Sequence, residues 1–218
     1  VAAASSAAKF WHPRGGFKAE VLSTQKLGQV HFSWPGDVRQ LRRRFPQLEQ
    51  RLRADAKHIT RNMEQRGGGV QDIELIDLSD VEPHYYQLRV RFETCDSMGA
   101  NFINSVLEEF GNSLKAYMTE QDGLAEQERE LEIIMAILSN YTPDCMVRAS
   151  VSCAVDALQG ACPDMPAEEF AQKFAKAIRI AEIDPYRATT HNKGIFNGVD
   201  AVVLATGNDF RAIEACGH

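Results

Sequence analysis

The sequence predicts an α+β fold, and three patterns in its 218 residues carry that prediction. Two short runs, at residues 72–78 and 86–92, alternate apolar and polar residues, which is the pattern of half-buried strands. Longer runs before and after this pair repeat apolar residues at helical spacing, which indicates amphipathic helices. The two ends of the chain are rich in small and helix-forming residues, which favours a second, mostly helical α+β part.

In the first third of the chain, the sequence predicts a helix, two strands and a long second helix. Residues 1–10 are rich in alanine and serine and read as a closely packed helix. Strand-like runs follow at residues 19–22 and 29–32. Apolar positions then recur at helical spacing over residues 38–63. Pro46 falls inside this helix, so we expect it to kink the helix or to split off its first turn.

A second helix follows the strand pair. It is expected to begin at Asp96 or Ser97, and its apolar stripe runs to Met118. Residues 131–138 fit a strand or a helix, and we favour a strand. From about residue 18 to residue 140 the order is therefore β-α-β-β-α-β, the ferredoxin-like split arrangement.

The remaining residues predict a second domain. Residues 147–155 alternate as a strand does, and a helix with apolar positions from Phe170 to Ala181 follows Pro166. We expect residues 1–20 and 144–218 to form one domain, into which the ferredoxin-like unit, residues 21–143, is inserted.

Composition argues against several classes of protein. No apolar run reaches the roughly 18 residues of a membrane helix, and there is no secretory signal. The net charge of −6 argues against a nucleic-acid partner. The five cysteines show no metal-ligand spacing, so we expect a cytoplasmic protein without a metal site. Both ends fall inside apparent helices, so we expect an internal fragment of a longer protein.

The strongest chemical signal lies at residues 191–211, HNKGIFNGVDAVVLATGNDFR. If the fold brings Lys193 and Asp209 together, the lysine stays cationic and can hold a developing oxyanion. A buried Lys–Asp pair in a packed loop explains the same residues about equally well. The glycines at positions 194, 198 and 207 supply tight turns or room for a ligand.

Residues 96–101, DSMGAN, follow a predicted strand and open a helix. Gly99 and Ala100 leave the helix N-terminus unshielded, so backbone N–H groups and the helix dipole can meet a pyrophosphate. The pattern is not the GxGxxG fingerprint. Taken alone, it is better explained by a capped helix with small residues in its first turn.

A non-catalytic function from another class also fits the sequence. The long helix is basic, and a ferredoxin-like module with such a helix could dock nucleotides or a protein partner. For the first half of the helix a solvated face is the simpler explanation. The cations are Arg39, Arg42, Arg43, Arg44, Arg51, Arg53, Lys57 and Arg61.

Four segments occur in an order that resembles one known family. They read VAAASSAAKF at residues 1–10, CDSMGAN at 95–101, DPYRATTHNKG at 184–194, and HNKGIFNGVD with ATGNDFRAIEA at 191–215. Together they resemble the 3-hydroxy-3-methylglutaryl-coenzyme A (HMG-CoA) reductases, in their bacterial class II form. The similarity runs from end to end and is weakest at residues 115–135.

The resemblance implies the NAD(P)H-dependent four-electron reduction of HMG-CoA to mevalonate and coenzyme A, or the reverse. Lys193 would stabilise the oxyanion, and Asp209 would hold Lys193. Arg187 would bind the free carboxylate of the substrate, although a structural salt bridge to Asp184 explains this residue about equally well. Asn197 would hold the substrate or the lysine. The catalytic glutamate and histidine of the family match no residue here, so we expect this chain alone to be inactive.

The resemblance also assigns the domains and the cofactor site. Residues 21–143 would form the small dinucleotide-binding domain, and residues 1–20 with 144–218 would be parts of the large substrate-binding, catalytic domain. Ser97 stands where the family has alanine, a small change that should be tolerated. The expected cofactor-binding residues are Asp96, Ser97, Met98, Gly99, Asn101, Asn140, Thr60 and Arg61.

Cofactor choice depends on position 60. In NAD-using relatives we expect an acidic residue seven residues before the glycine run, and this chain has Thr60 there. Arg61 and Lys57 lie close by in sequence, so we favour NADPH over NADH. The family builds its site between two subunits, which implies a homodimer or larger assembly. HMG-CoA, mevalonate and coenzyme A would be its ligands, and no nucleic acid or membrane partner is implied.

Overall fold

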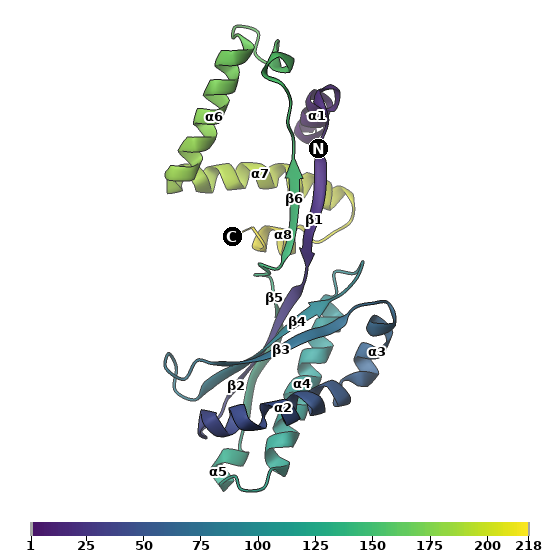
Figure 1. Ribbon diagram of the computed structural model, residues 1–218, viewed down its shortest axis with the longest axis vertical. Helices are drawn as coiled ribbons and strands as arrows, with labels where there is room; N and C mark the ends of the chain where they lie inside the picture. The colour runs from purple at the N-terminus through teal and green to yellow at the C-terminus, as the bar shows by residue number, and fades with distance from the viewer. Residues whose placement is uncertain (1, 218) are drawn as a thin grey trace. The chain divides into compact units, whose positions relative to one another are not determined.

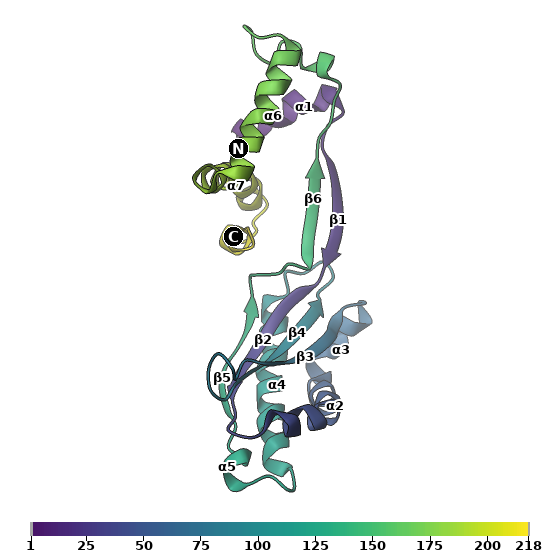
Figure 2. The same ribbon diagram turned by 60° about the vertical axis from the view of Figure 1, so that its left-hand side comes forward.

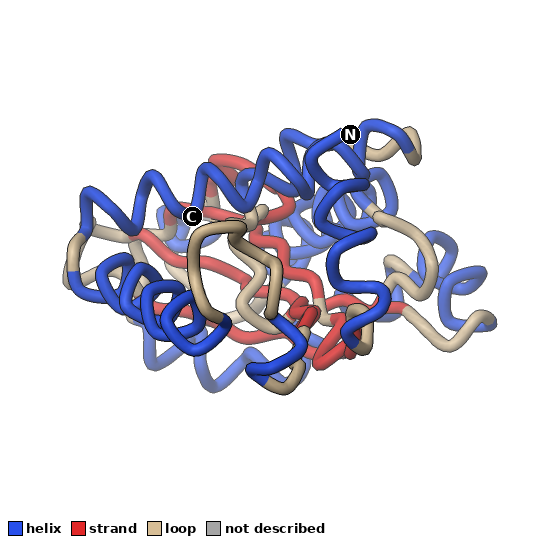
Figure 3. Tube along the Cα trace, turned by 90° about the horizontal axis from the view of Figure 1, so that it is seen from above, coloured by secondary structure: helices blue, strands red, loops and turns tan. Residues whose placement is uncertain are grey.

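The structure, a computed structural model, describes residues 2–217 and has the predicted α+β class (Figure 1). The chain divides into two compact units. The first unit combines Val1–Leu22 with Val147–His218, and the second is Ser23–Met146. Helices and strands along the trace are distinguished by colour in Figure 3.

The second unit is built on a four-stranded sheet in the order β3-β4-β2-β5, in which neighbouring strands are antiparallel. With the helices between these strands, the arrangement is the predicted ferredoxin-like β-α-β-β-α-β, and α2 and α4 pack on the sheet (Figure 2). The strands are β2 (Lys26–Ser33), β3 (Gly69–Asp77), β4 (Tyr85–Glu93) and β5 (Glu132–Ser139). The helices are α2 (Val38–Asp55), α3 (Lys57–Gln65), α4 (Ala100–Glu120) and the short α5 (Glu126–Arg129).

Alternating residues of the central strands form the core of this unit together with one stripe of α4. Val30 lies opposite Leu88 in the β2–β4 register, and both are fully buried. The predicted apolar stripe of α4 supplies the other side of the core. Its buried members are Ile103, Val106, Leu107, Phe110, Leu114 and Met118.

Two helix boundaries in this unit differ from the prediction. Of the two alternatives at Pro46, the split does not occur, because Pro46 lies inside α2; the break comes at Ala56, a fully buried residue between α2 and α3. The second helix begins at Ala100 rather than at position 96 or 97. Cys95 and Gly99 have φ values of 52° and 80°, and these left-handed conformations keep residues 95–99 out of the helix.

The first unit is mostly helical. Its helices are α1 (Ala2–Trp11), η1 (His12–Arg14), η2 (Val155–Leu158), α6 (Ala167–Ile183), α7 (Pro185–Ala205) and α8 (Phe210–Ala215). Strand β1 (Lys18–Thr24) pairs with β6 (Cys145–Ser150). The strand predicted at residues 147–155 is therefore too long, because Val155 already opens a 3₁₀ helix. Among residues 2–217, no helix is long and apolar enough to span a membrane.

Candidate functional site

Helix α7 carries most of the residues expected to do chemistry, and it is continuous through Gly194 and Gly198. Of the two alternatives for these glycines, tight turns or room for a ligand, the turns are therefore excluded, whereas Gly207, with φ 72°, does lie in the turn after the helix. The helix starts where Asp184 accepts a hydrogen bond from the backbone N–H of Tyr186 at 3.1 Å. Pro185 occupies the first helical position, where its missing N–H costs nothing.

Lys193 presents an exposed ammonium group. Its Nζ donates to Oδ1 of Asn197 at 2.9 Å, one helical turn further along α7. Asn197 is a neutral partner, so the positive charge of the lysine is not neutralised by this bond. Asp200, on the same side of the helix by spacing, has a buried Oδ1 without a hydrogen-bond partner among the described residues.

Asp209 is engaged elsewhere in this chain. Its Oδ1 accepts hydrogen bonds from the backbone N–H groups of Arg211 at 3.1 Å and Ala212 at 3.4 Å, which caps α8. Within residues 2–217, Lys193 and Asp209 form no hydrogen bond or ion pair with each other. The end of α8 is nevertheless tied to α7 beside the lysine, because Nδ2 of Asn192 donates to the carbonyl of Gly217 at 3.0 Å.

Arg187 is exposed near the start of α7, and the part of the chain that is described gives it no ion-pair partner. Among the described residues, Arg187 forms no salt bridge to Asp184, three residues before it. At about 3.6 residues per turn, Arg187, Gly194 and Gly198 lie on one stripe of the helix. A Cβ atom added at either glycine would meet nothing within 4 Å. The stripe is therefore open along its length, with a guanidinium at one end.

The second group of expected residues surrounds the N-terminus of α4. Gly99 is the N-cap residue and has no side chain to occupy the first N–H groups of the helix. Asp96, Met98 and Asn101 are exposed around it. This end of α4 therefore has free backbone donors and the positive end of the helix dipole, which suit a phosphate group.

The turn before α4 is held by side-chain hydrogen bonds. Oγ1 of Thr94, a fully buried residue, donates to the Ser97 carbonyl at 2.7 Å, and Oγ of Ser97 donates to the Thr94 carbonyl at 2.7 Å. The serine hydroxyl is thus used inside the turn. Lys26 Nζ donates to the Ser97 carbonyl at 3.0 Å and to Thr94 Oγ1.

Lys26 is a residue that sequence reasoning missed. It is brought to the turn by the strand register, which pairs Lys26 of β2 with Phe92 of β4. The β2–β5 register pairs Leu27 with Ser139, so Asn140 follows on the other side of Lys26. The sheet thus gathers Lys26, Asn140 and the turn before α4. No local sequence pattern marks Lys26, because its position depends on the pairing of distant strands.

Thr60 is almost entirely buried, at 3% exposed. Its Oγ1 donates to Oε1 of Glu64 at 2.7 Å, and the other carboxylate oxygen of Glu64 pairs with Lys57. The hydrogen bond from Lys57, and then that from Thr60, hold the pKa of Glu64 below its usual value. Arg61 is exposed beside this group. The C-terminal end of α3 reaches the turn before α4, because Cys95 Sγ donates to the carbonyl of Arg66, the C-cap residue, at 3.3 Å.

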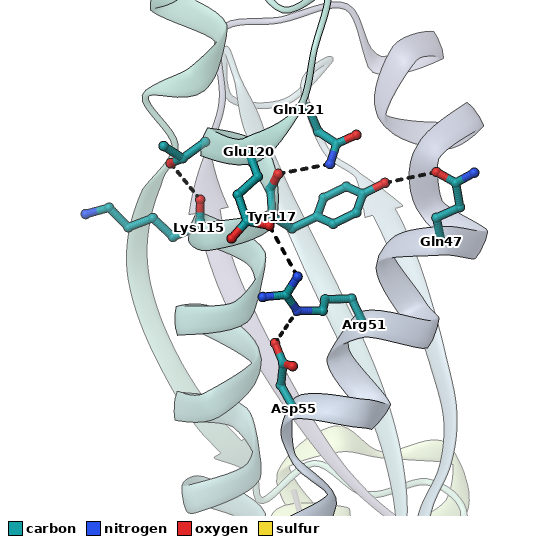
Figure 4. A network of polar contacts seen from close by, with 8 residues as sticks. Gln47, Arg51, Asp55, Lys115, Tyr117, Glu120 and Gln121 are labelled. Carbon is teal, nitrogen blue, oxygen red and sulfur yellow. Dashed lines mark hydrogen bonds and ion pairs between the residues drawn. The ribbon is translucent and has the colours of Figure 1, made fainter.

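The basic helix is not a free cationic surface, because most of its cations are paired. Arg51 pairs with Asp55 of its own helix at 2.7 Å and joins α2 to α4 through Glu120 at 3.2 Å (Figure 4). The other ion pairs are Arg39 with Asp37, Arg42 with Asp77, Arg53 with Glu49, and Lys57 with Glu64. This pairing weakens the case for a general polyanion-binding module.

Comparison with known proteins gives one consistent family. The model of the family described as hydroxymethylglutaryl-coenzyme A reductase matches residues 1–218. The chain is 29% identical over 223 residues to the 3-hydroxy-3-methylglutaryl-coenzyme A reductase of Archaeoglobus fulgidus, covering 100% of this chain and 46% of that protein. It is 30% identical over 196 residues to a probable 3-hydroxy-3-methylglutaryl-coenzyme A reductase of Borreliella burgdorferi, covering 88% of this chain and 40% of the relative. The chain thus spans less than half the length of these two curated relatives.

Solved structures agree. The structure of the class II 3-hydroxy-3-methylglutaryl-CoA reductase from Streptococcus pneumoniae bound to NADPH is 37% identical in sequence and gives a TM-score of 0.79. The match covers 99% of this chain and 55% of that one. A second structure of the Streptococcus pneumoniae enzyme, also 37% identical, gives a TM-score of 0.80.

Proposed function

This chain belongs to the hydroxymethylglutaryl-coenzyme A reductase family, and we propose that it takes part in the reduction of HMG-CoA to mevalonate and coenzyme A, or in the reverse reaction. The observation that carries the proposal is the family match over residues 1–218. The open face of α7 beside Lys193 is consistent with it.

Lys193 is the proposed catalytic residue in this chain. Reduction of a thioester places negative charge on its carbonyl oxygen, and a fixed ammonium group stabilises that charge. Asn197 holds the lysine side chain along the helix and leaves its charge intact. Asp209 is proposed to act on Lys193 in the working enzyme, and a carboxylate near the ammonium group would keep it protonated.

Arg187 is proposed to bind the free carboxylate of the substrate. Its guanidinium is exposed and unpaired in the described residues, so it can form two parallel hydrogen bonds with a carboxylate. The bare stripe at positions 194 and 198 gives the substrate room to lie against α7. Residues 1–20 with 144–218 would then be parts of the substrate-binding, catalytic domain.

Residues 21–143 are proposed to form the dinucleotide-binding domain. The turn before α4 fits a dinucleotide, because Gly99 leaves backbone donors open and Asp96, Met98 and Asn101 are exposed beside them. When bound, the reduced dinucleotide supplies hydride to the substrate. Lys26 and Ser97 hold the turn by hydrogen bonds, and Asn140 follows Ser139, the β5 residue that pairs with Leu27.

NADPH is the proposed cofactor. The solved relative from Streptococcus pneumoniae is described as bound to NADPH. In this chain position 60 is a threonine rather than an acid, with Arg61 exposed beside it. Thr60 and Arg61 are thus proposed to lie near the adenosine ribose.

A homodimer or larger assembly, with the site between subunits, is part of the proposal, as is a cytoplasmic location. Size-exclusion chromatography with light scattering tests the assembly. The alternative function, a non-catalytic nucleotide- or partner-binding module, is disfavoured because most cations of the basic helix form ion pairs with carboxylates.

The experiment is a product assay on the protein encoded by the full reading frame. HMG-CoA and NADPH should yield mevalonate and free coenzyme A, with about two NADPH consumed per mevalonate, because the reduction takes four electrons. The 218-residue chain alone should show no turnover. Absence of mevalonate from the full-length protein would refute the proposed function, and near-full turnover by the chain alone would refute the assignment of roles.

A further inference from the structure

Glu64 occupies the space beside Thr60 with a negative charge. Its carboxylate reaches back one turn of α3, where it accepts the Thr60 hydroxyl at 2.7 Å and pairs with Lys57. The side chain of Glu64 is 38% exposed and that of Lys57 is 62% exposed, so both charges face solvent as well as each other.

These residues line a cavity of about 150 Å³. A water molecule takes about 30 Å³ in the liquid, so the space is of the size that the oxygens of one phosphate group need. Arg53 also lines the cavity, but it is bonded to Glu49 at 2.9 Å and to the Val70 carbonyl at 3.0 Å. An entering group therefore meets the charges of Lys57, Glu64 and Arg53, of which Arg53 is held by its own bonds to Glu49 and the Val70 carbonyl.

We propose that the Lys57–Glu64 pair sets the choice between NADPH and NADH. The inference rests on the proposed function, which puts the adenosine ribose near Thr60. Glu64 supplies, from one turn further along α3, the acidic group that position 60 lacks. Its carboxylate accepts a hydrogen bond from a free ribose 2′-hydroxyl and repels a 2′-phosphate.

Lys57 acts in the opposite sense. It neutralises Glu64 in the free protein and attracts a 2′-phosphate, so the two residues largely cancel. Arg61, which is exposed nearby, then makes binding of NADPH more favourable than binding of NADH. The wild type is therefore expected to bind both dinucleotides, with a modest preference for NADPH.

The test measures dissociation constants of NADPH and NADH for the protein encoded by the full reading frame, from the fluorescence of the bound reduced nicotinamide. Glu64→Gln should raise the preference for NADPH on the order of tenfold, because one charge near the phosphate is removed. Lys57→Gln should lower it by a similar factor. Glu169→Gln, which breaks an exposed Lys–Glu pair of 2.7 Å on α6, is the matched control and should leave the ratio within about twofold.

Opposite shifts in the two variants would support the proposal, since loss of folding weakens both dinucleotides alike and cannot move the ratio in two directions. If the wild type binds both dinucleotides and neither variant changes the ratio beyond the control, the inference is wrong and the proposed function survives. If the wild type binds neither dinucleotide, the proposed cofactor site is wrong, and so is the inference that rests on it.

Discussion

Gly99→Ala should destabilise the second unit, residues 23–146, more than an ordinary glycine substitution does. Gly99 has φ 80°, a conformation that costs an L-residue about 1–2 kcal/mol. The new Cβ would also lie 2.8 Å from Cβ of Thr94 and closer still to its Cγ2. Thr94 is fully buried and bonded to the Ser97 carbonyl, so it cannot move aside freely. Overpacking of this kind adds about 1–3 kcal/mol, for a total of about 2–5 kcal/mol.

Gly67→Ala is the matched control in the same unit. Gly67 has φ 91°, but nothing lies within 4 Å of an added Cβ, so only the backbone strain of about 1–2 kcal/mol applies. Urea unfolding of both variants and the wild type, followed by circular dichroism, gives the two free energies. The reasoning is refuted if Gly99→Ala loses no more stability than Gly67→Ala.

Two further predictions concern the same unit. The pKa values of Glu93, Glu64 and Asp77 lie below their usual range, chiefly because of hydrogen bonds from Thr24, Lys57 and Ser79 respectively. Carboxyls with depressed pKa values stabilise the fold above their ordinary pKa and lose that contribution as the pH falls through the folded values, so urea unfolding should show stability declining from about pH 5 downward. A flat profile between pH 7 and pH 3 would contradict this. Lys26→Met removes the donor to the Ser97 carbonyl, so amide exchange at residues 95–99 should speed up and the Kd for NADPH should rise, with partial rescue by Lys26→Arg. Unchanged exchange in Lys26→Met would show that the lysine does not hold the turn.

The second unit was largely predictable because its burial is periodic. The apolar stripe of α4 predicts an amphipathic helix, and the alternation in β3 and β4 predicts half-buried strands. The helix and the strands are both present in the structure and contribute to one core. Helix boundaries that depend on backbone conformation were harder to predict from the sequence. The turn at residues 95–99 depends on two left-handed residues, one of which, Cys95, is not a glycine.

The candidate site was predictable in part. Residue types and spacing drew attention to Lys193 and Asn197, and the structure joins them by one hydrogen bond. Lys26 could not have been found, because only the register of β2 with β4 brings it to the turn. Glu64 could have been found from the sequence, since it lies four residues after Thr60 on a predicted helix.

The central claim, that Lys193 stabilises the oxyanion of a reductase, is tested most directly by kcat for HMG-CoA-dependent NADPH oxidation in the full-length protein. Lys193→Ala should lose about 3 kcal/mol or more of transition-state stabilisation, on the order of a hundredfold in kcat, with a smaller effect on KM. Lys173→Ala, which removes an exposed lysine paired with Glu169 on α6, should leave kcat unchanged. A Lys193→Ala enzyme that keeps more than about a tenth of wild-type kcat would contradict the account.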